Sequence, residues 1–192
     1  MLAASNGAAY LPATLAAIGA QTTQPERLVA VDGASRDGSR ALLEASQASS
    51  VVITQRLPYG ALIGKGVATL PEAEDDDWLW LLAHDAAPHP RSLEALLAHA
   101  EAHPSVAVVG SKVMRADEPD RFAEFGQSMT PFGRSLLLHE GELDQGQHDD
   151  DSDRLGVAET GVLVRRDAFA ALGGFDPALR SIDAGLDLGV RA

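Results

Sequence analysis

Short runs of β-branched residues alternate with amphipathic stretches along this chain, and the alternation strongly limits the possible folds. The runs cover residues 28–31, 51–53 and 106–109, each bounded by Gly, Ser, Pro or Asp, and they predict buried parallel strands. Apolar side chains at helical spacing lie around them: Leu11, Leu15 and Ile18, then Leu42 and Leu43, then Leu93, Leu96 and Leu97. We therefore expect an α/β fold, a mostly parallel sheet flanked by helices, with its ligand site at the carboxyl ends of the strands.

Signals for helix starts support this assignment. Pro12 lies early in the first helical stretch, Ser39 stands ahead of the second, and Pro90 and Ser92 precede the third. Residues 161–164 predict another strand, and residues 166–172 predict a short helix closed by two glycines. Residues 115–154 lack a sustained period, so we expect irregular structure there with short antiparallel strands.

The composition narrows the functional classes. The 192 residues, 45% of them hydrophobic, suffice for one core and predict a single domain over 1–192. A net charge of −13 disfavours nucleic acid and anionic membrane surfaces as partners, and a phosphate ligand would need a carboxylate-bound divalent cation. The chain has no cysteine and no apolar run near the length of a membrane span, so we expect a cytoplasmic segment. Both ends look cut, because little apolar sequence precedes Ser5 and the last helical segment stops at Ala192.

Two acidic positions follow predicted strands. Asp32 ends the first run and opens the turn of residues 32–39, where it could accept hydrogen bonds from a base or ribose; the turn's polar residues could equally only cap the next helix. His84 and Asp85 end the apolar run of residues 78–83, where a carboxylate suits Mg²⁺ or Mn²⁺ on a diphosphate, although Asp85 could also simply cap a helix. The acidic runs of residues 74–77 and 148–153 are interpreted as surface turns.

Four ordered motifs resemble family 2 glycosyltransferases. They are residues 5–12 (SNGAAYLP), residues 31–39 (VDGASRDGS), His84 with Asp85, and residues 173–177 (GGFDP), with the glycine-rich residues 59–66 between the second and third. The resemblance implies an inverting enzyme with the Rossmann-like glycosyltransferase type A fold, truncated at one or both ends. Its nucleotide-binding part would span about residues 1–112, and its acceptor side about residues 113–192.

The resemblance also implies roles for individual residues. A nucleotide diphosphate sugar, expected to be uridine-linked, would be bound by Ser5, Asn6, Asp32, Ser35, Gly60, Lys65, His84 and Asp85. Asp85 would hold the metal, and Gly161, Gly173 and Gly174 would shape the sugar and acceptor side, unless these glycines only end helices and allow close packing. The acceptor would be a polysaccharide, a lipid-linked glycan or a cell-envelope glycan, with the full-length protein in the cytoplasm or at the inner face of the membrane.

The chain departs from the family pattern at the acidic motifs. Gly33 replaces the second acid after the first long strand, and His84 with Asp85 replaces the acid-x-acid metal motif. Ala184 and Gly185 occupy the positions of the usual acidic pair, which leaves Asp183 as the favoured catalytic base. Asp187 is a second candidate for the base, or a structural residue.

Two other functions fit the same pattern. The chain could be a non-catalytic nucleotide-sugar-binding or scaffold domain, as the loss of the acidic pair suggests. It could also be a sugar nucleotidyltransferase, but such enzymes hold a triphosphate with basic residues near the amino terminus, and residues 5–11 contain no Lys or Arg.

Overall fold

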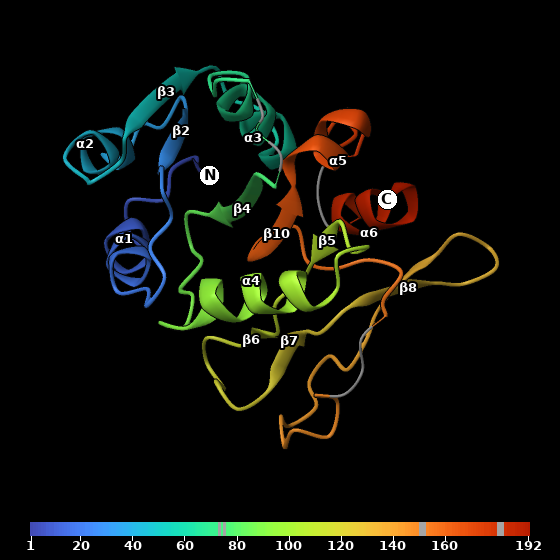
Figure 1. Ribbon diagram of the computed structural model, residues 1–192. Coiled ribbons are helices and arrows are strands. Elements are labelled where there is room, and N and C mark those ends of the chain that lie inside the picture. The colour runs from blue at the N-terminus through green and yellow to red at the C-terminus, as the bar shows by residue number, and fades with distance from the viewer. Residues whose placement is uncertain (73, 75, 150–152, 180–182) are drawn as a thin grey trace.

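A six-stranded sheet forms the centre of the computed structural model, which describes residues 1–72, 74, 76–149, 153–179 and 183–192. The strand order is β3-β2-β1-β4-β10-β5 (Figure 1). The strands are β1 (Leu2–Ala4), β2 (Val29–Gly33), β3 (Ser50–Thr54), β4 (Trp78–Ala83), β5 (Val108–Val109) and β10 (Val162–Arg165). β1 pairs in parallel with β2 and β4, and β2 pairs in parallel with β3, whereas β10 runs antiparallel to both β4 and β5. The mostly parallel sheet expected from the sequence is confirmed, with β10 as its reversed strand.

Helices cover both faces of the sheet. They are α1 (Leu11–Gly19), α2 (Ser39–Glu44), α3 (Tyr59–Val67), α4 (Ser92–Ala102), α5 (Arg166–Ala171) and α6 (Ala184–Arg191). α1, α2 and α4 bury one apolar core against the sheet, and α3, α5 and α6 bury the other. Val29 and Val31 point to the second core while Ala30 points to the first, because successive side chains of a strand face opposite sides. Apolar cover on both faces explains why the strands read as nearly continuous apolar runs.

The helix α3 replaces the glycine-rich segment that the sequence suggested. Glycine costs about 1 kcal/mol relative to alanine inside a helix, so three glycines obscure the helical signal. Leu62 and Ile63 are buried against the sheet, and Gly66 lets the helix approach closely, since a Cβ there would lie 2.8 Å from Val31 Cγ2. Tertiary packing therefore outweighs the local preference.

Residues 113–149 and 153–156 lie outside the main sheet, beyond α4 (Figure 1). Their short strands are β6 (Val113–Met114), β7 (Phe122–Glu124), β8 (Gln127–Met129) and β9 (Ser135–Leu137), which pair antiparallel as β6-β7 and β8-β9. The expected irregular segment with short antiparallel strands is confirmed.

The start of α6 is packed directly on backbone. A Cβ added to Gly185 would lie 1.9 Å from the carbonyl oxygen of Val157, well inside van der Waals contact. The position that the resemblance assigns to the second acid is thus filled by neighbouring backbone, and no larger side chain fits there without a backbone shift.

We predict that Gly185→Ala lowers the free energy of unfolding by about 1–3 kcal/mol, as overpacking does where backbone cannot move aside. Urea denaturation followed by circular dichroism measures the change. Gly64→Ala in α3 is the matched control, because a Cβ there meets nothing within 4 Å and alanine favours the helix. Equal stability of the two variants would contradict the packing described for α6.

Candidate functional site

The loops after β1 and β2 are joined by hydrogen bonds at the carboxyl edge of the sheet. The Asn6 main-chain N–H donates to Ser35 Oγ at 2.9 Å, and Asn6 Oδ1 accepts the Arg36 N–H at 2.9 Å. Ser5 Oγ donates to the Gly33 carbonyl at 3.3 Å. The structure therefore brings three of the predicted nucleotide-binding residues, Ser5, Asn6 and Ser35, to one place.

Asp37 and Ser39 join the same two loops by further hydrogen bonds. Ser39 Oγ, fully buried, accepts the Gly7 N–H at 2.8 Å and donates to Asp37 Oδ1 at 2.6 Å. Asp37 Oδ2 accepts the Ala8 N–H at 2.9 Å. These bonds favour the ionised carboxylate and lower the pKa of Asp37, with the Ser39 hydroxyl as the largest cause. The N-cap of α2 is Gly38, without a side-chain capping bond, so Asp37 and Ser39 serve to bridge the two loops.

Asp32 lies at the end of β2 and is only 1% exposed. Both of its carboxylate oxygens lie 3.4 Å from the Ser35 main-chain nitrogen, which is long for an N–H···O bond. Burying a carboxylate is costly unless strong donors surround it. The position is therefore suited to accept hydrogen bonds from a bound base or ribose.

His84 and Asp85 follow β4 at the same edge. The His84 ring packs against the first loop, since a Cβ at Gly7 would lie 2.2 Å from His84 Cδ2. The His84 carbonyl accepts a 2.7 Å bond from Thr14 Oγ1 in α1. With His84 fixed in this way, the next residue, Asp85, is exposed at the open edge.

Glu159 and Thr160 join this edge although the sequence did not identify them. Thr160 Oγ1 accepts the Ala83 N–H at 2.9 Å, which fixes the start of the reversed strand beside the end of β4. Burial raises the pKa of the half-buried Glu159 carboxyl. Burial also raises the pKa of the Tyr59 hydroxyl well above its usual value, and the charges of Glu159 and Asp85 add to this effect. The charges of Glu159 and Asp85 therefore both act on the Tyr59 hydroxyl.

Two predicted binding residues lie in packing positions or away from the edge. Gly60 in α3 faces Phe175, because a Cβ there would lie 2.6 Å from Phe175 Cβ. Lys65 is exposed six residues beyond Tyr59, about 9 Å further along the helix at 1.5 Å per residue. The neighbouring Gly66 packs on Met1 and Val31, which places this end of α3 toward the amino ends of β1 and β2. The structure does not bring Lys65 together with Asn6 and Asp85.

The three glycines predicted for the acceptor side have different settings. Gly161 has φ 73° at the carboxyl edge, donates to the Leu81 carbonyl and accepts from Ser111 Oγ at 2.5 Å. Gly173 and Gly174 end α5 with φ 75° and 74°. The Gly174 N–H donates to the Phe169 carbonyl, a hydrogen bond that is typical where a residue in the left-handed conformation ends a helix. Helix termination accounts for Gly173 and Gly174.

The two predicted catalytic aspartates, Asp183 and Asp187, differ in their side-chain hydrogen bonds. Asp183 is exposed just before α6 and makes no side-chain capping bond. Asp187 Oδ2 accepts a 2.9 Å bond from Arg191 Nε, and Arg191 also donates to the carbonyls of Leu172 and Gly174. The Asp187–Arg191 pair therefore ties α6 to the end of α5. The preceding motif residues 181 and 182 lie outside the described residues.

The predicted surface runs are only partly described, because residues 75 and 150–152 lie outside the described part of the chain. Asp77 accepts a 2.9 Å bond from Arg166 Nη1 at the amino end of β4, opposite the candidate site. Asp149 and Asp153 of the second run are exposed as expected, whereas His148 is partly buried, with an 18% exposed side chain. It packs beside Phe122 and Phe125, whose rings shield it.

The Asp85 carboxylate is suited to a cation that a bound ligand also coordinates. Among the described residues, three metal-ligating side chains gather only at His139, Glu142 and His148, away from Asp85. Mg²⁺ commonly binds one or two carboxylates and completes its shell with substrate phosphates and water. Asp85 at an open edge fits that mode of binding, and it does not form a complete protein cage.

A cavity of about 930 Å³ lies elsewhere. It separates α4 and residues 105–112 from residues 125–126 and 153–157. None of the predicted site residues lines it. The candidate site is thus an edge formed by loops.

Comparison with known proteins places the chain in a family. A model of glycosyl transferase family 2 matches residues 2–173, so the chain belongs to this family. No curated protein sequence matches it. The family resemblance inferred from the sequence is confirmed.

Solved structures confirm the type A fold. S. aureus TarS 1-349 in complex with UDP has 16% identity and a TM-score of 0.65, over 98% of this chain and 52% of that one. The same protein in complex with UDP-GlcNAc matches 100% of this chain and 51% of its own, with 16% identity and a TM-score of 0.65. The mannosyltransferase PcManGT from Pyrobaculum calidifontis, in complex with GDP-Man and Mn²⁺, has 19% identity and a TM-score of 0.57, over 96% and 48%. The chain thus spans about half the length of these relatives.

We predict that Glu159→Gln raises the unfolding free energy at pH 7 relative to the wild type. The folded state binds the Glu159 proton more tightly than the unfolded chain does, so stability falls as pH rises above the ordinary carboxyl pKa of about 4.3. Glutamine removes this loss, and the advantage of the variant should shrink as the pH approaches 4. Thermal unfolding at several pH values measures it, with the exposed Glu101→Gln in α4 as control. A variant less stable than the wild type at pH 7 would contradict the assignment.

Proposed function

We propose that this chain is the nucleotide-sugar-binding part of an inverting glycosyltransferase. The observation that carries the proposal is the joining of the loops after β1 and β2 beside Asp85 at one sheet edge. Membership of glycosyl transferase family 2 supports sugar transfer as the reaction. The donor would be a nucleotide diphosphate sugar, and we favour a uridine-linked one because the structurally similar TarS was solved with UDP and UDP-GlcNAc.

Different residues at the edge would bind different parts of the donor. Ser5, Asn6 and Ser35 would line the base, and Asp32 would accept bonds from the uracil or ribose. Asp85 would hold Mg²⁺ or Mn²⁺ against the diphosphate, where the ion would offset the charge of the leaving nucleoside diphosphate. His84 would support this position by packing against Gly7. Gly161 would border the sugar.

Inversion requires a base that deprotonates the acceptor hydroxyl on the face opposite the leaving group. We assign this role to Asp183, because it is exposed before α6 and makes no capping bond. Asp187 is given a structural role, since Arg191 holds it. The acceptor would be a polysaccharide, a lipid-linked glycan or a cell-envelope glycan that meets residues 113–192 on the cytoplasmic side of a membrane. No helix among the described residues has the length and apolarity to cross a membrane.

A non-catalytic binding domain is the second candidate, and one observation favours it. Ala184 is 3% exposed, and Gly185 is packed on the Val157 carbonyl, so the family's acidic pair is replaced by packing. Such a domain would keep the donor edge while lacking transfer.

We predict that UDP binds the chain more tightly with Mn²⁺ than without it, and that Asp85→Ala removes the metal-dependent part. Isothermal titration calorimetry measures both affinities. Glu72→Ala is the matched control, since Glu72 is exposed near Asp77 and Arg166, at the opposite edge. UDP binding that ignores Mn²⁺, or equal losses in the two variants, would contradict the donor site.

A transfer assay on the full-length protein separates the two candidates. An enzyme that uses Asp183 as its base should lose about 10²–10⁴-fold in turnover as Asp183→Asn and keep its UDP affinity. Glu159→Gln tests the other carboxylate near Asp85 in the same assay. UDP binding without transfer or donor hydrolysis in the wild type would favour the non-catalytic domain.

A further inference from the structure

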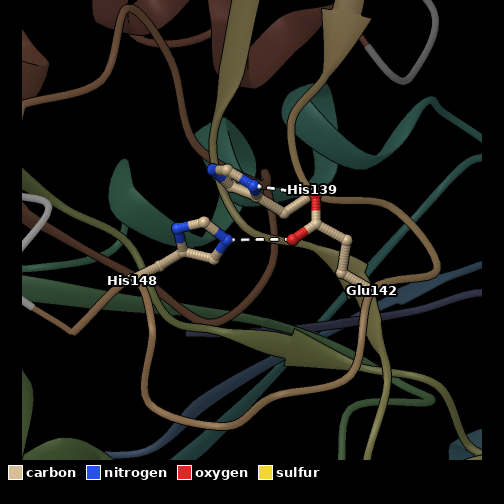
Figure 2. A group of neighbouring side chains, drawn as sticks. All are labelled: His139, Glu142 and His148. Atoms are coloured by element: carbon tan, nitrogen blue, oxygen red, sulfur yellow. Dashed lines mark hydrogen bonds and ion pairs between the residues drawn. The ribbon is translucent and has the colours of Figure 1, made fainter.

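Two imidazoles and a carboxylate converge in the segment outside the main sheet. Figure 2 shows the rings of His139 and His148 facing the carboxylate of Glu142. His139 Nδ1 lies 3.2 Å from Glu142 Oε1, and His148 Nε2 lies 2.9 Å from Glu142 Oε2. One ligating atom from each of the three residues lies within 4.8 Å of the others. We call these residues the His–Glu–His cluster.

The first two members lie on a turn that is fixed to β7. The Glu142 N–H donates to the His139 carbonyl at 3.1 Å. The Gly141 N–H donates to the Phe122 carbonyl and the Phe122 N–H donates to the Glu142 carbonyl, both at 2.9 Å. His139 has φ 59°, a left-handed conformation that histidine adopts infrequently. The backbone therefore holds His139 and Glu142 in place before any ligand binds.

Lys112 anchors the part of the chain that carries the third member. Its Nζ lies 2.9 Å from Asp144 Oδ1 and also contacts Asp149 Oδ1, next to His148. Two carboxylates thus outweigh the lysine charge, and Glu142 adds a further negative charge. Lys112 is therefore paired with its own carboxylates, which leaves Glu142 to the two imidazoles.

The His–Glu–His cluster is shielded by an aromatic ring on one side and open to solvent on the other. His139 and His148 are 21% and 18% exposed, and they pack near the ring of Phe125 at 6.1 and 6.4 Å between centroids. Their own ring centroids lie 3.6 Å apart, so one ion can reach both rings. A metal ion would bind both rings in their neutral form. Glu142 is 50% exposed, which leaves access for an ion from solvent.

We propose that the His–Glu–His cluster binds a divalent transition-metal ion of the Zn²⁺ type, with water in the remaining position. Zinc binds imidazole nitrogen and carboxylate oxygen at about 2.0–2.2 Å, which puts tetrahedral ligands roughly 3.4 Å apart. The separations of 2.9 and 3.2 Å are close to that spacing. The nitrogen donors disfavour Mg²⁺ and Ca²⁺, which prefer oxygen.

The proposed site is independent of the donor site and of sugar transfer. Its ion would join the turn at residues 139–142 to His148 across the face of Phe122 and Phe125. Since binding to the folded state alone stabilises that state, the ion would strengthen the packing of residues 113–149.

The test begins with the chain stripped of metal by a chelator and dialysed. Isothermal titration with Zn²⁺ should show one site per chain, and Co²⁺ should give the visible absorption of a tetrahedral nitrogen and oxygen site. His139→Ala, His148→Ala and Glu142→Gln should each weaken binding beyond the about 10–100-fold expected for loss of an outer-shell partner. Mg²⁺ in excess should not displace Zn²⁺.

Matched variants distinguish this site from others. His99→Ala alters the stacked pair formed by His99 of α4 and His103 just after that helix, and it should leave Zn²⁺ affinity unchanged, as should Asp85→Ala. Zn²⁺ should raise the melting temperature of the wild type but not of the cluster variants, whose metal-free melting temperatures show whether they fold. Absence of stoichiometric binding, unchanged affinity in folded cluster variants, or loss of binding in His99→Ala would overturn the proposal.

Discussion

The short strand β1 pairs with β2 on one side and β4 on the other, and this double pairing positions the candidate site. Ala4 is in register with Asp32, and Ala3 with Ala83, so all three strands end at nearly the same level. Their following loops must then meet at one edge, as carboxyl ends of parallel strands do. Ser39 and Asp37 fix that meeting with buried or charge-assisted bonds. The binding groups are thereby arranged before any ligand arrives.

Most of the sheet could be predicted from the sequence because apolar runs reveal strands that are covered on both faces. The direction of a strand, in contrast, produces no such pattern in the sequence. Glu159 precedes its strand and would lie at the far edge of a wholly parallel sheet, but the reversal of β10 brings it to the edge where β4 ends. A local pattern could not show this, because the direction of β10 is fixed by pairing with β4, more than 80 positions away. The contact of Gly185 with Val157 and the convergence of His139 with His148 depend instead on loop conformation, which also leaves no pattern in the sequence.

Packing and chemistry compete for the same positions in this chain. Gly173, Gly174 and Gly60 resemble the family's functional glycines in sequence, yet their visible tasks are to end α5 and to admit Phe175. Lys65 lies in a segment that resembles the family's, but α3 places this polar residue away from the carboxyl edge. The motifs therefore predicted which loops meet more reliably than they predicted the surroundings of single residues, because the loops follow from the fold and the side chains depend on local contacts.

The central claim is that the carboxyl edge formed after β1, β2 and β4 binds the nucleotide. Amide NMR of the ¹⁵N-labelled chain during a titration with UDP and Mg²⁺ tests it most directly, since each backbone N–H reports its own surroundings. We expect the largest shift changes at Asn6, Ser35 and Asp85. Changes centred on Arg27 and Arg166 at the opposite edge, or on the cavity beneath α4, would contradict the account.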